Sequence, residues 1–239
     1  MNTRKIPVTP LFIIGLLFLI LFGLIAFGVS GNRDWVRRFD MYWIDHIQGL
    51  ASEGLTSFIK VFTELGDVRV VIVLTILIAA ILFVKKRFAD GLWFGGTILF
   101  CAVIIEMLLK KIFDRERPDI MQLISETGAS FPSGHATATT IFYGFIGLVL
   151  VLSAKKLSAM IWTGLISFLL IVFILLSRVY LGVHYPTDVA AGFCYGMAAV
   201  FISIAAYALL QQPLRDFLNK VHLKDQSKPI NEKRRRQYD

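Results

Sequence analysis

Two of the four histidines in this chain have neighbours that favour acid–base or nucleophilic chemistry. His135 follows Pro132-Ser133-Gly134 at the start of an apolar run, and His184 precedes Asp188 by four residues. A carboxylate near a helix start can accept a hydrogen bond from one imidazole nitrogen, which makes the other nitrogen a better nucleophile. A histidine in the first turn of a membrane helix, beside a site for an anion, is placed for proton transfer. The pattern predicts His184 as nucleophile, oriented by Asp188, and His135 as general acid and base.

Three cations and a helix start predict a binding site for a phosphate-like anion. Lys110, Arg117 and Arg178 lie at or just after the ends of apolar runs, where a helix dipole favours positive charge. Arg grips an oxyanion with two parallel donors, and Lys neutralises it as a point charge. Ser133 is expected to cap the next helix, and Gly134 lets a ligand approach its free N–H groups. Capping explains each feature singly but not all of them together.

The carboxylates near these motifs do not form a recognisable metal site. Glu106 precedes Lys110 by four residues, so the two are expected to pair on one helical face. The other acids of the motif loops lack the ligand pattern of a one- or two-metal site: Asp114, Glu116, Asp119, Glu126 and Asp188. Cys101 and Cys194 lie in apolar runs, without metal-ligand spacing. We therefore expect no metal and no cofactor.

The composition is that of an integral membrane protein. Of 239 residues, 56% are apolar and 18% charged, and the mean hydropathy is +0.68. Soluble domains are nearer 45–50% apolar and 25% charged. Spans of roughly 20 apolar residues are needed to cross a bilayer. Six runs approach that length: 10–30, 70–84, 91–109, 136–154, 157–177 and 189–210. We predict an all-α bundle of six transmembrane helices over residues 1–213, followed by a basic tail, 214–239.

The first run, 10–30, resembles a signal peptide in its basic start, but it exceeds the apolar length of one. It is therefore read as a span.

Charge distribution predicts the orientation of these spans. The net charge is +8, which in so apolar a chain marks the cytosolic membrane surface rather than a nucleic-acid partner. Most Lys and Arg lie at the N-terminus, at 85–87, at 155–156 and in the tail, which contains a basic run at 233–236. Both termini are therefore expected in the cytosol, with the loops 31–69, 110–135 and 178–188 outside. Aromatic residues between charges at 34–65 predict interfacial helices.

Small residues recur along the sixth run and have two interpretations. Close helix packing is favoured over a groove for a lipid tail. The residues are Ala190, Ala191, Gly192, Gly196, Ala198 and Ala199.

The three clusters together resemble the signatures of the type 2 phosphatidic acid phosphatase superfamily. They are Lys110-x6-Arg117-Pro118, Pro132-Ser133-Gly134-His135 and Ser177-Arg178-x5-His184-x3-Asp188, in the family's order and spacing. The resemblance implies a six-helix membrane bundle with its active site on the outer face. It also implies metal-independent hydrolysis of a phosphomonoester or pyrophosphate through a phosphohistidine at His184. In that mechanism a cradle binds the phosphoryl group: Lys110, Arg117, Ser133, Gly134 and Arg178.

Within the superfamily the sequence is similar to bacterial membrane lipid phosphatases of the phosphatidylglycerophosphatase B kind. This similarity implies phosphatidylglycerophosphate as substrate, with looser activity on other lipid phosphates. The partners expected are thus the membrane and a lipid within it, not nucleic acid. An undecaprenyl-pyrophosphate phosphatase would need the same site and stays an alternative. A transporter and a vanadate-dependent haloperoxidase are remoter ones, since only Glu106 is charged inside a span and the haloperoxidases are soluble.

Overall fold

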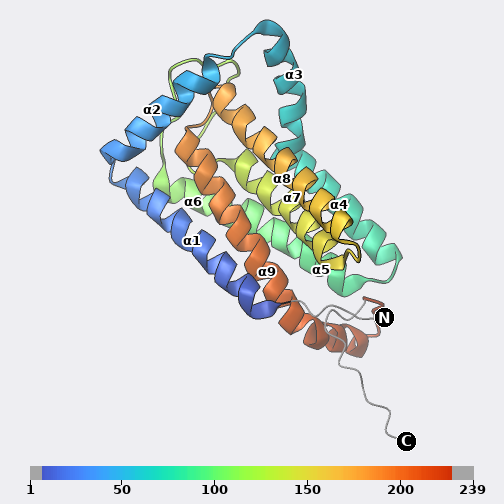
Figure 1. Cartoon of the computed structure of the whole chain (residues 1–239). Helices are drawn as coiled ribbons and strands as arrows, with labels where there is room; N and C mark the ends of the chain where they lie inside the picture. The colour runs from blue at the N-terminus through green and yellow to red at the C-terminus, as the bar shows by residue number, and fades with distance from the viewer. Residues whose placement is uncertain (1–6, 228–239) are drawn as a thin grey trace, which may run out of the picture.

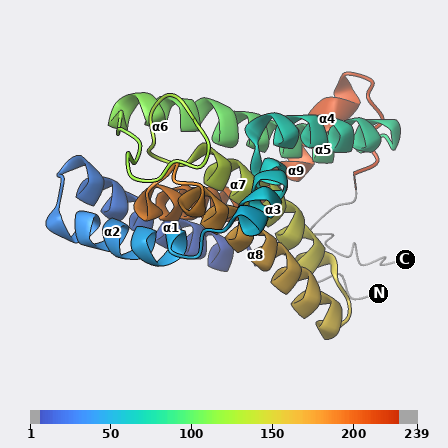
Figure 2. The ribbon, with the colours of Figure 1, turned by 90° about the horizontal axis from the view of Figure 1, so that it is seen from above.

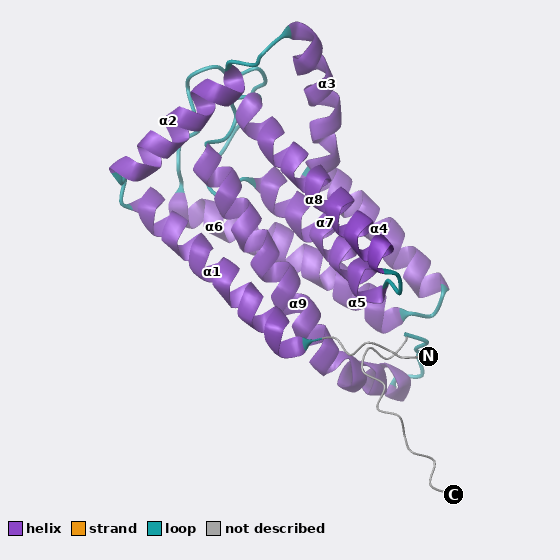
Figure 3. Cartoon of the chain, viewed as in Figure 1, coloured by secondary structure: helices purple, strands orange, loops and turns teal. Residues whose placement is uncertain are grey.

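The computed structural model describes residues 7–227, and within that range every regular element is a helix (Figures 1 and 3). The basic run at 233–236 lies outside the described residues. The elements in chain order are α1 (Val8–Ser30), α2 (Asp34–Gln48), α3 (Glu53–Thr63), the short 3₁₀ turn η1 (Glu64–Gly66), α4 (Val68–Val84), α5 (Phe88–Thr97), the π-helical η2 (Ile98–Ile105), α6 (Glu106–Phe113), α7 (Gly134–Ser153), α8 (Leu157–Tyr180) and α9 (Pro186–Lys220). The predicted all-α membrane fold is confirmed.

Within residues 7–227, five helical segments are long and apolar enough to cross a bilayer. They are α1, the continuous segment α5–η2–α6, α7, α8 and α9. The one remaining expected span, 70–84, corresponds to α4, whose 17 residues reach only about 25 Å. It follows α3 and η1 after a bend of 47°, and the bent pair together makes the sixth candidate.

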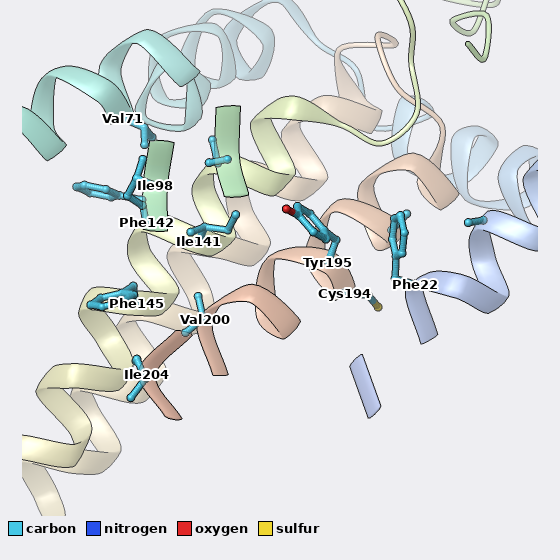
Figure 4. Packing of buried hydrophobic residues seen from close by; sticks show 14 of the residues in the cluster. Phe22, Val71, Ile98, Ile141, Phe142, Phe145, Cys194, Tyr195, Val200 and Ile204 are labelled. Atoms are coloured by element: carbon cyan, nitrogen blue, oxygen red, sulfur yellow. The ribbon is translucent and has the colours of Figure 1, made fainter. Parts of the chain in front are cut away.

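The bundle has α7 and α9 at its centre, and their crossing depends on small residues. A Cβ atom at Gly196 would lie 2.6 Å from the Thr140 Cβ, and one at Gly192 would lie 2.9 Å from the Ala136 Cβ. Figure 4 shows Ile141 of α7 and Val200 of α9 among the buried apolar residues between these helices and their neighbours. The small residues of the sixth run thus serve close packing.

An apolar groove also runs along this region, and its use by a lipid tail stays a prediction. Ala198 and Ala199 line an apolar groove of about 440 Å³ between α1, α5–η2 and α9. Its other walls include Leu92 and Ile105, from opposite ends of the third span.

The three motifs lie together at one end of the bundle. Helix α1 begins, and α9 ends, at the opposite end, beside the turns at 85–87 and 154–156 (Figure 1). Figure 2 looks down on the motif end, where α2, α3 and the loop after α6 surround the start of α9. Helices α2 and α3 thus form where the aromatic pattern at 34–65 predicted helices; their position at the membrane interface stays a prediction.

Helix α9 continues through Pro213 to Lys220, past the boundary expected at 213. The segment after it folds back onto α5. Asp225 Oδ1 accepts a hydrogen bond of 3.0 Å from the Ala89 N–H, and Ser227 Oγ accepts one of 3.2 Å from the Asp90 N–H. These contacts cap the otherwise unpaired amides at the start of α5.

Candidate active site

The start of α7 and the start of α9 are joined through their main chains. Ser133 caps α7, its Oγ accepting from the Ala136 N–H at 3.4 Å. The Ser133 N–H in turn donates to the Asp188 carbonyl oxygen at 3.1 Å. Two of the predicted motifs therefore share one rigid backbone frame.

His184 is buried, with 1% of its surface exposed, and its ring nitrogens have distinct partners. Arg117 Nη1 lies 3.2 Å from Nε2. Because a guanidinium can only donate, this contact fits a neutral ring whose proton is on Nδ1. In that tautomer Nε2 carries the lone pair that a nucleophile needs.

Ser130 lies between His184 and Asp188. Asp188 Oδ2 is 3.7 Å from His184 Nδ1, too far for the direct hydrogen bond that the spacing predicts. The Ser130 hydroxyl donates to Asp188 Oδ2 at 2.5 Å and lies 3.3 Å from His184 Nδ1. The carboxylate also accepts from the Tyr185 N–H at 2.9 Å. Asp188 thus reaches the imidazole through a hydroxyl, which sequence reasoning missed although Ser130 adjoins the second motif.

The electrostatics keep His184 neutral. Burial lowers its pKa to about 4, while the neighbouring Asp188 carboxylate opposes that shift and the charge of Arg117 adds to it. At neutral pH the ring is unprotonated and Nε2 is available for reaction.

The predicted cations converge on the same place. Arg178, 1% exposed, donates from Nη1 to Thr63 Oγ1 at 3.1 Å, and Arg117 Nη1 donates to the Val183 carbonyl at 2.8 Å. Lys110 Nζ lies 3.1 Å from Glu106 Oε1, the pair that the i,i+4 spacing predicts.

Gly134 leaves the room that these groups need. A Cβ atom there would come within 2.8 Å of Glu106 Oε1 and 3.4 Å of Lys110 Nζ. Lys110 therefore lies against the start of α7, beside its free amides.

A carboxylate occupies the space between the arginines. Glu126 Oε2 is 3.0 Å from Arg117 Nη1 and 3.8 Å from His184 Nε2, and Oε1 pairs with Arg178. Burial favours a raised pKa for Glu126, but the charges of Arg178 and the other basic groups around it together outweigh burial and hold the pKa below its usual value. An anion thus sits among the groups predicted to bind phosphate. The sequence pattern does not predict this position for Glu126, which is there only one of several acids in the motif loops.

His135 lies at the edge of this cluster, on the first turn of α7. Its Nε2 is 3.9 Å from Asp67 Oδ2, at the start of α4, and its electrostatic neighbours include Arg178, Glu126 and His184. The remaining histidines, His46 and His222, are exposed.

The arrangement can bind a three-oxygen anion and present an imidazole nitrogen to its centre. Among residues 7–227, no three His, Cys, Asp or Glu side chains form a group that could hold a metal ion.

Comparison with known proteins agrees with this chemistry. The PAP2 superfamily model matches residues 90–211. Phosphatidylglycerophosphatase B of Bacillus subtilis is 36% identical over 149 residues, 59% of this chain and 69% of the relative. A decaprenylphosphoryl-5-phosphoribose phosphatase of Mycobacterium tuberculosis is 36% identical over 107 residues, 43% of this chain and 53% of the relative.

A solved structure has the same fold. It is the crystal structure of the transmembrane PAP2 type phosphatidylglycerolphosphate phosphatase from Bacillus subtilis, with a TM-score of 0.73 and 27% identity. The similarity covers 80% of this chain and 94% of that one. The resemblance inferred from the three motifs is confirmed. The chain belongs to the PAP2 superfamily and is a multi-pass membrane phosphoric monoester hydrolase.

Proposed function

We propose that this enzyme hydrolyses phosphatidylglycerophosphate to phosphatidylglycerol and phosphate through a phosphohistidine at His184, without a metal ion. The observation that carries the proposal is the Glu126 carboxylate held between Arg117 and Arg178, 3.8 Å from His184 Nε2. A site that binds one anion against an imidazole lone pair suits in-line attack on phosphorus.

In the first step the phosphoryl group replaces the Glu126 carboxylate. Its oxygens are bound by the side chains and backbone amides of the cradle, which neutralise the charge of the transition state. The cradle consists of Lys110, Arg117, Ser133, Gly134 and Arg178, with the His135 N–H. His184 Nε2 forms a bond to phosphorus while the bond to the lipid oxygen breaks. As the general acid of this step, His135 gives a proton to that oxygen.

In the second step, water hydrolyses the phosphohistidine. His135, now neutral, takes a proton from water as the oxygen attacks phosphorus, and the P–N bond breaks. Free phosphate leaves, His184 returns to its neutral form and His135 is again protonated. Through both steps Asp188 stabilises the positive charge on the His184 ring, with the Ser130 hydroxyl between them.

We place the site on the outer face, with both termini in the cytosol. The basic turns at 85–87 and 155–156 lie at the end opposite the motifs, which supports this orientation by the positive-inside rule.

The similarity to phosphatidylglycerophosphatase B supports the glycerophospholipid substrate. A polyprenyl substrate such as undecaprenyl pyrophosphate is the second candidate, because the similar mycobacterial protein is by its name a phosphatase of a decaprenylphosphoryl compound.

The test is phosphate release by detergent-solubilised enzyme from phosphatidylglycerophosphate, phosphatidic acid and undecaprenyl pyrophosphate in parallel, with and without excess chelator. We expect the highest kcat/KM on the first lipid and no loss with chelator. Preference for the polyprenyl lipid would favour the second candidate, and loss reversed by Mg²⁺ would contradict metal independence.

The role of His184 as nucleophile is tested by His184→Ala. The matched control is His46→Ala, an exposed histidine on α2. We expect the first variant to lose turnover and the trapped phosphoenzyme, and the second to keep both. Full activity of His184→Ala removes His184 from this role.

A further inference from the structure

A buried carboxylate from a distant helix reaches the motif that contains the nucleophile. Asp40 on α2 is 1% exposed and lies on the buried stripe of that helix with Val36, Ile44 and Gln48. Its Oδ1 accepts from the Thr187 N–H at 2.8 Å, and its Oδ2 from the Thr187 hydroxyl at 2.9 Å. The charge is thus directed at the first turn of α9.

Arg115 joins this carboxylate to Asp188. Its Nη2 donates to Asp40 Oδ2 at 2.8 Å, and its Nη1 donates to Asp188 Oδ1 at 2.5 Å. The guanidinium stacks 4.0 Å over the Tyr185 ring, which fixes its plane. The main-chain carbonyl oxygen of Arg115 accepts a hydrogen bond from the Ser130 N–H at 2.7 Å. Arg115 therefore contacts both groups that orient His184.

Two carboxylates share this one guanidinium, and that balance affects the imidazole. Alone with Arg115, Asp188 would be largely neutralised as a counter-charge to the ring. Because Asp40 also pairs with Arg115, the three side chains Asp40, Arg115 and Asp188 together carry a net negative charge. Burial raises the pKa of Asp40, and its bond to Arg115 opposes that effect.

Resting on the proposed function, we propose that Asp40 and Arg115 are positioning residues for His184. They hold Asp188 and Ser130 in position beside His184, and their charges contribute to the electrostatic potential at the imidazole ring. Neither touches the phosphoryl group.

The test uses Asp40→Asn and Arg115→Gln in the full-length enzyme, with Asp45→Asn and Arg37→Gln on exposed positions of α2 as matched controls. In metal sites, removing a residue that orients a ligand typically costs about 10–100-fold, and we use the same scale for the residues that orient His184. We expect kcat to fall by roughly that factor with KM little changed, because phosphate binding is left intact. Arg115→Lys should restore part of the loss.

The pH profile of kcat/KM separates positioning from simple structural support. His184 must be neutral to attack, so activity falls as the pH drops through its pKa. Removing the negative charge of Asp40 lowers that pKa and moves the acidic limb to lower pH. Removing the positive charge of Arg115 moves it to higher pH, and the double variant returns towards wild type. The other charged groups facing His184 stay constant throughout: Asp188, Arg117, Arg178, Glu126 and His135.

The position of the limb does not depend on how much of a variant folds, so a partly unfolded preparation still gives an answer. The inference would be overturned if the acidic limb of the kcat/KM profile stayed at its wild-type pH in Asp40→Asn, Arg115→Gln and the double variant. It would also be overturned if the two single variants moved the limb in the same direction. If His184→Ala is inactive while Asp40→Asn behaves like Asp45→Asn, only this inference fails. If His184→Ala is fully active, the proposed function itself fails.

Discussion

At the scale of single residues, the most consequential side chain outside the motifs is Glu126. It neutralises two arginines that would otherwise repel each other in a partly buried place. The same contacts make it a competitor of the substrate phosphate. Binding of substrate therefore requires one anion to be exchanged for another.

Glu126→Gln should relieve that competition. We expect KM to fall by roughly tenfold, the equivalent of about 1.4 kcal/mol, with kcat changed much less. Initial rates over a range of lipid mole fractions in mixed micelles measure both parameters. Glu116→Gln, an exposed acid of the same loop, is the control. An unchanged or higher KM would mean that the carboxylate assists binding.

The pH dependence of this competition has a definite sign. The charges of Arg178 and the other basic groups around Glu126 together hold its pKa below the usual value despite burial, so the carboxylate stays ionised down to low pH. The difference in KM between wild type and Glu126→Gln should therefore persist from neutral to mildly acidic pH. It should shrink only when Glu126 becomes protonated.

Sequence reasoning located residues within motifs better than residues between them. Arg178, His184 and Asp188 lie in one short stretch, from the end of α8 through the connecting turn to the first turn of α9, so their closeness follows from the sequence. Glu126 and Arg115 lie in the loop at 114–133, where no periodicity indicates which side chains turn inward. Asp40 meets Thr187 only through packing of α2 against α9, which no local pattern records.

At the scale of elements, the crossing of α7 and α9 positions the site. Helix α7 supplies His135 and α9 supplies Asp188, so the closeness of these two helices determines the geometry between motifs. Recurrent small residues predicted this packing from the sequence. The π-helical stretch η2 and the bend before α4 depend on tertiary contacts and were not predicted.

Gly196→Ala should destabilise the protein, because its Cβ atom would lie 2.6 Å from the Thr140 Cβ. Overpacking of this kind costs about 1–3 kcal/mol. Gly95→Ala on α5 is the matched control, since a Cβ there meets nothing within 4 Å. Thermal unfolding in detergent should show a lower Tm for the first variant only. Equal Tm values would indicate that the helices separate at little cost.

At the scale of the whole molecule, the chemistry is concentrated at one end of the bundle, and the basic turns lie at the other. The proposed orientation follows from that separation. It can be tested with single cysteines at exposed positions, Glu53 near the motif end and Lys155 at the opposite end, in a chain whose two native cysteines are replaced.

An impermeant thiol reagent added to intact cells should label Glu53→Cys, since α3 is expected outside. Lys155→Cys should react only after the membrane is permeabilised. The reverse pattern would invert the topology and move the phosphatase site to the cytosol.

The hydrogen bond from the Ser133 N–H to the Asp188 carbonyl has a consequence for how such an enzyme can diversify. Because main-chain atoms make the link, the link itself does not depend on the side chains of Ser133 and Asp188, whereas Gly134 beside it must stay small. Substitutions in the apolar groove between α1, α5–η2 and α9 are therefore expected to leave the distance between the starts of α7 and α9 unchanged.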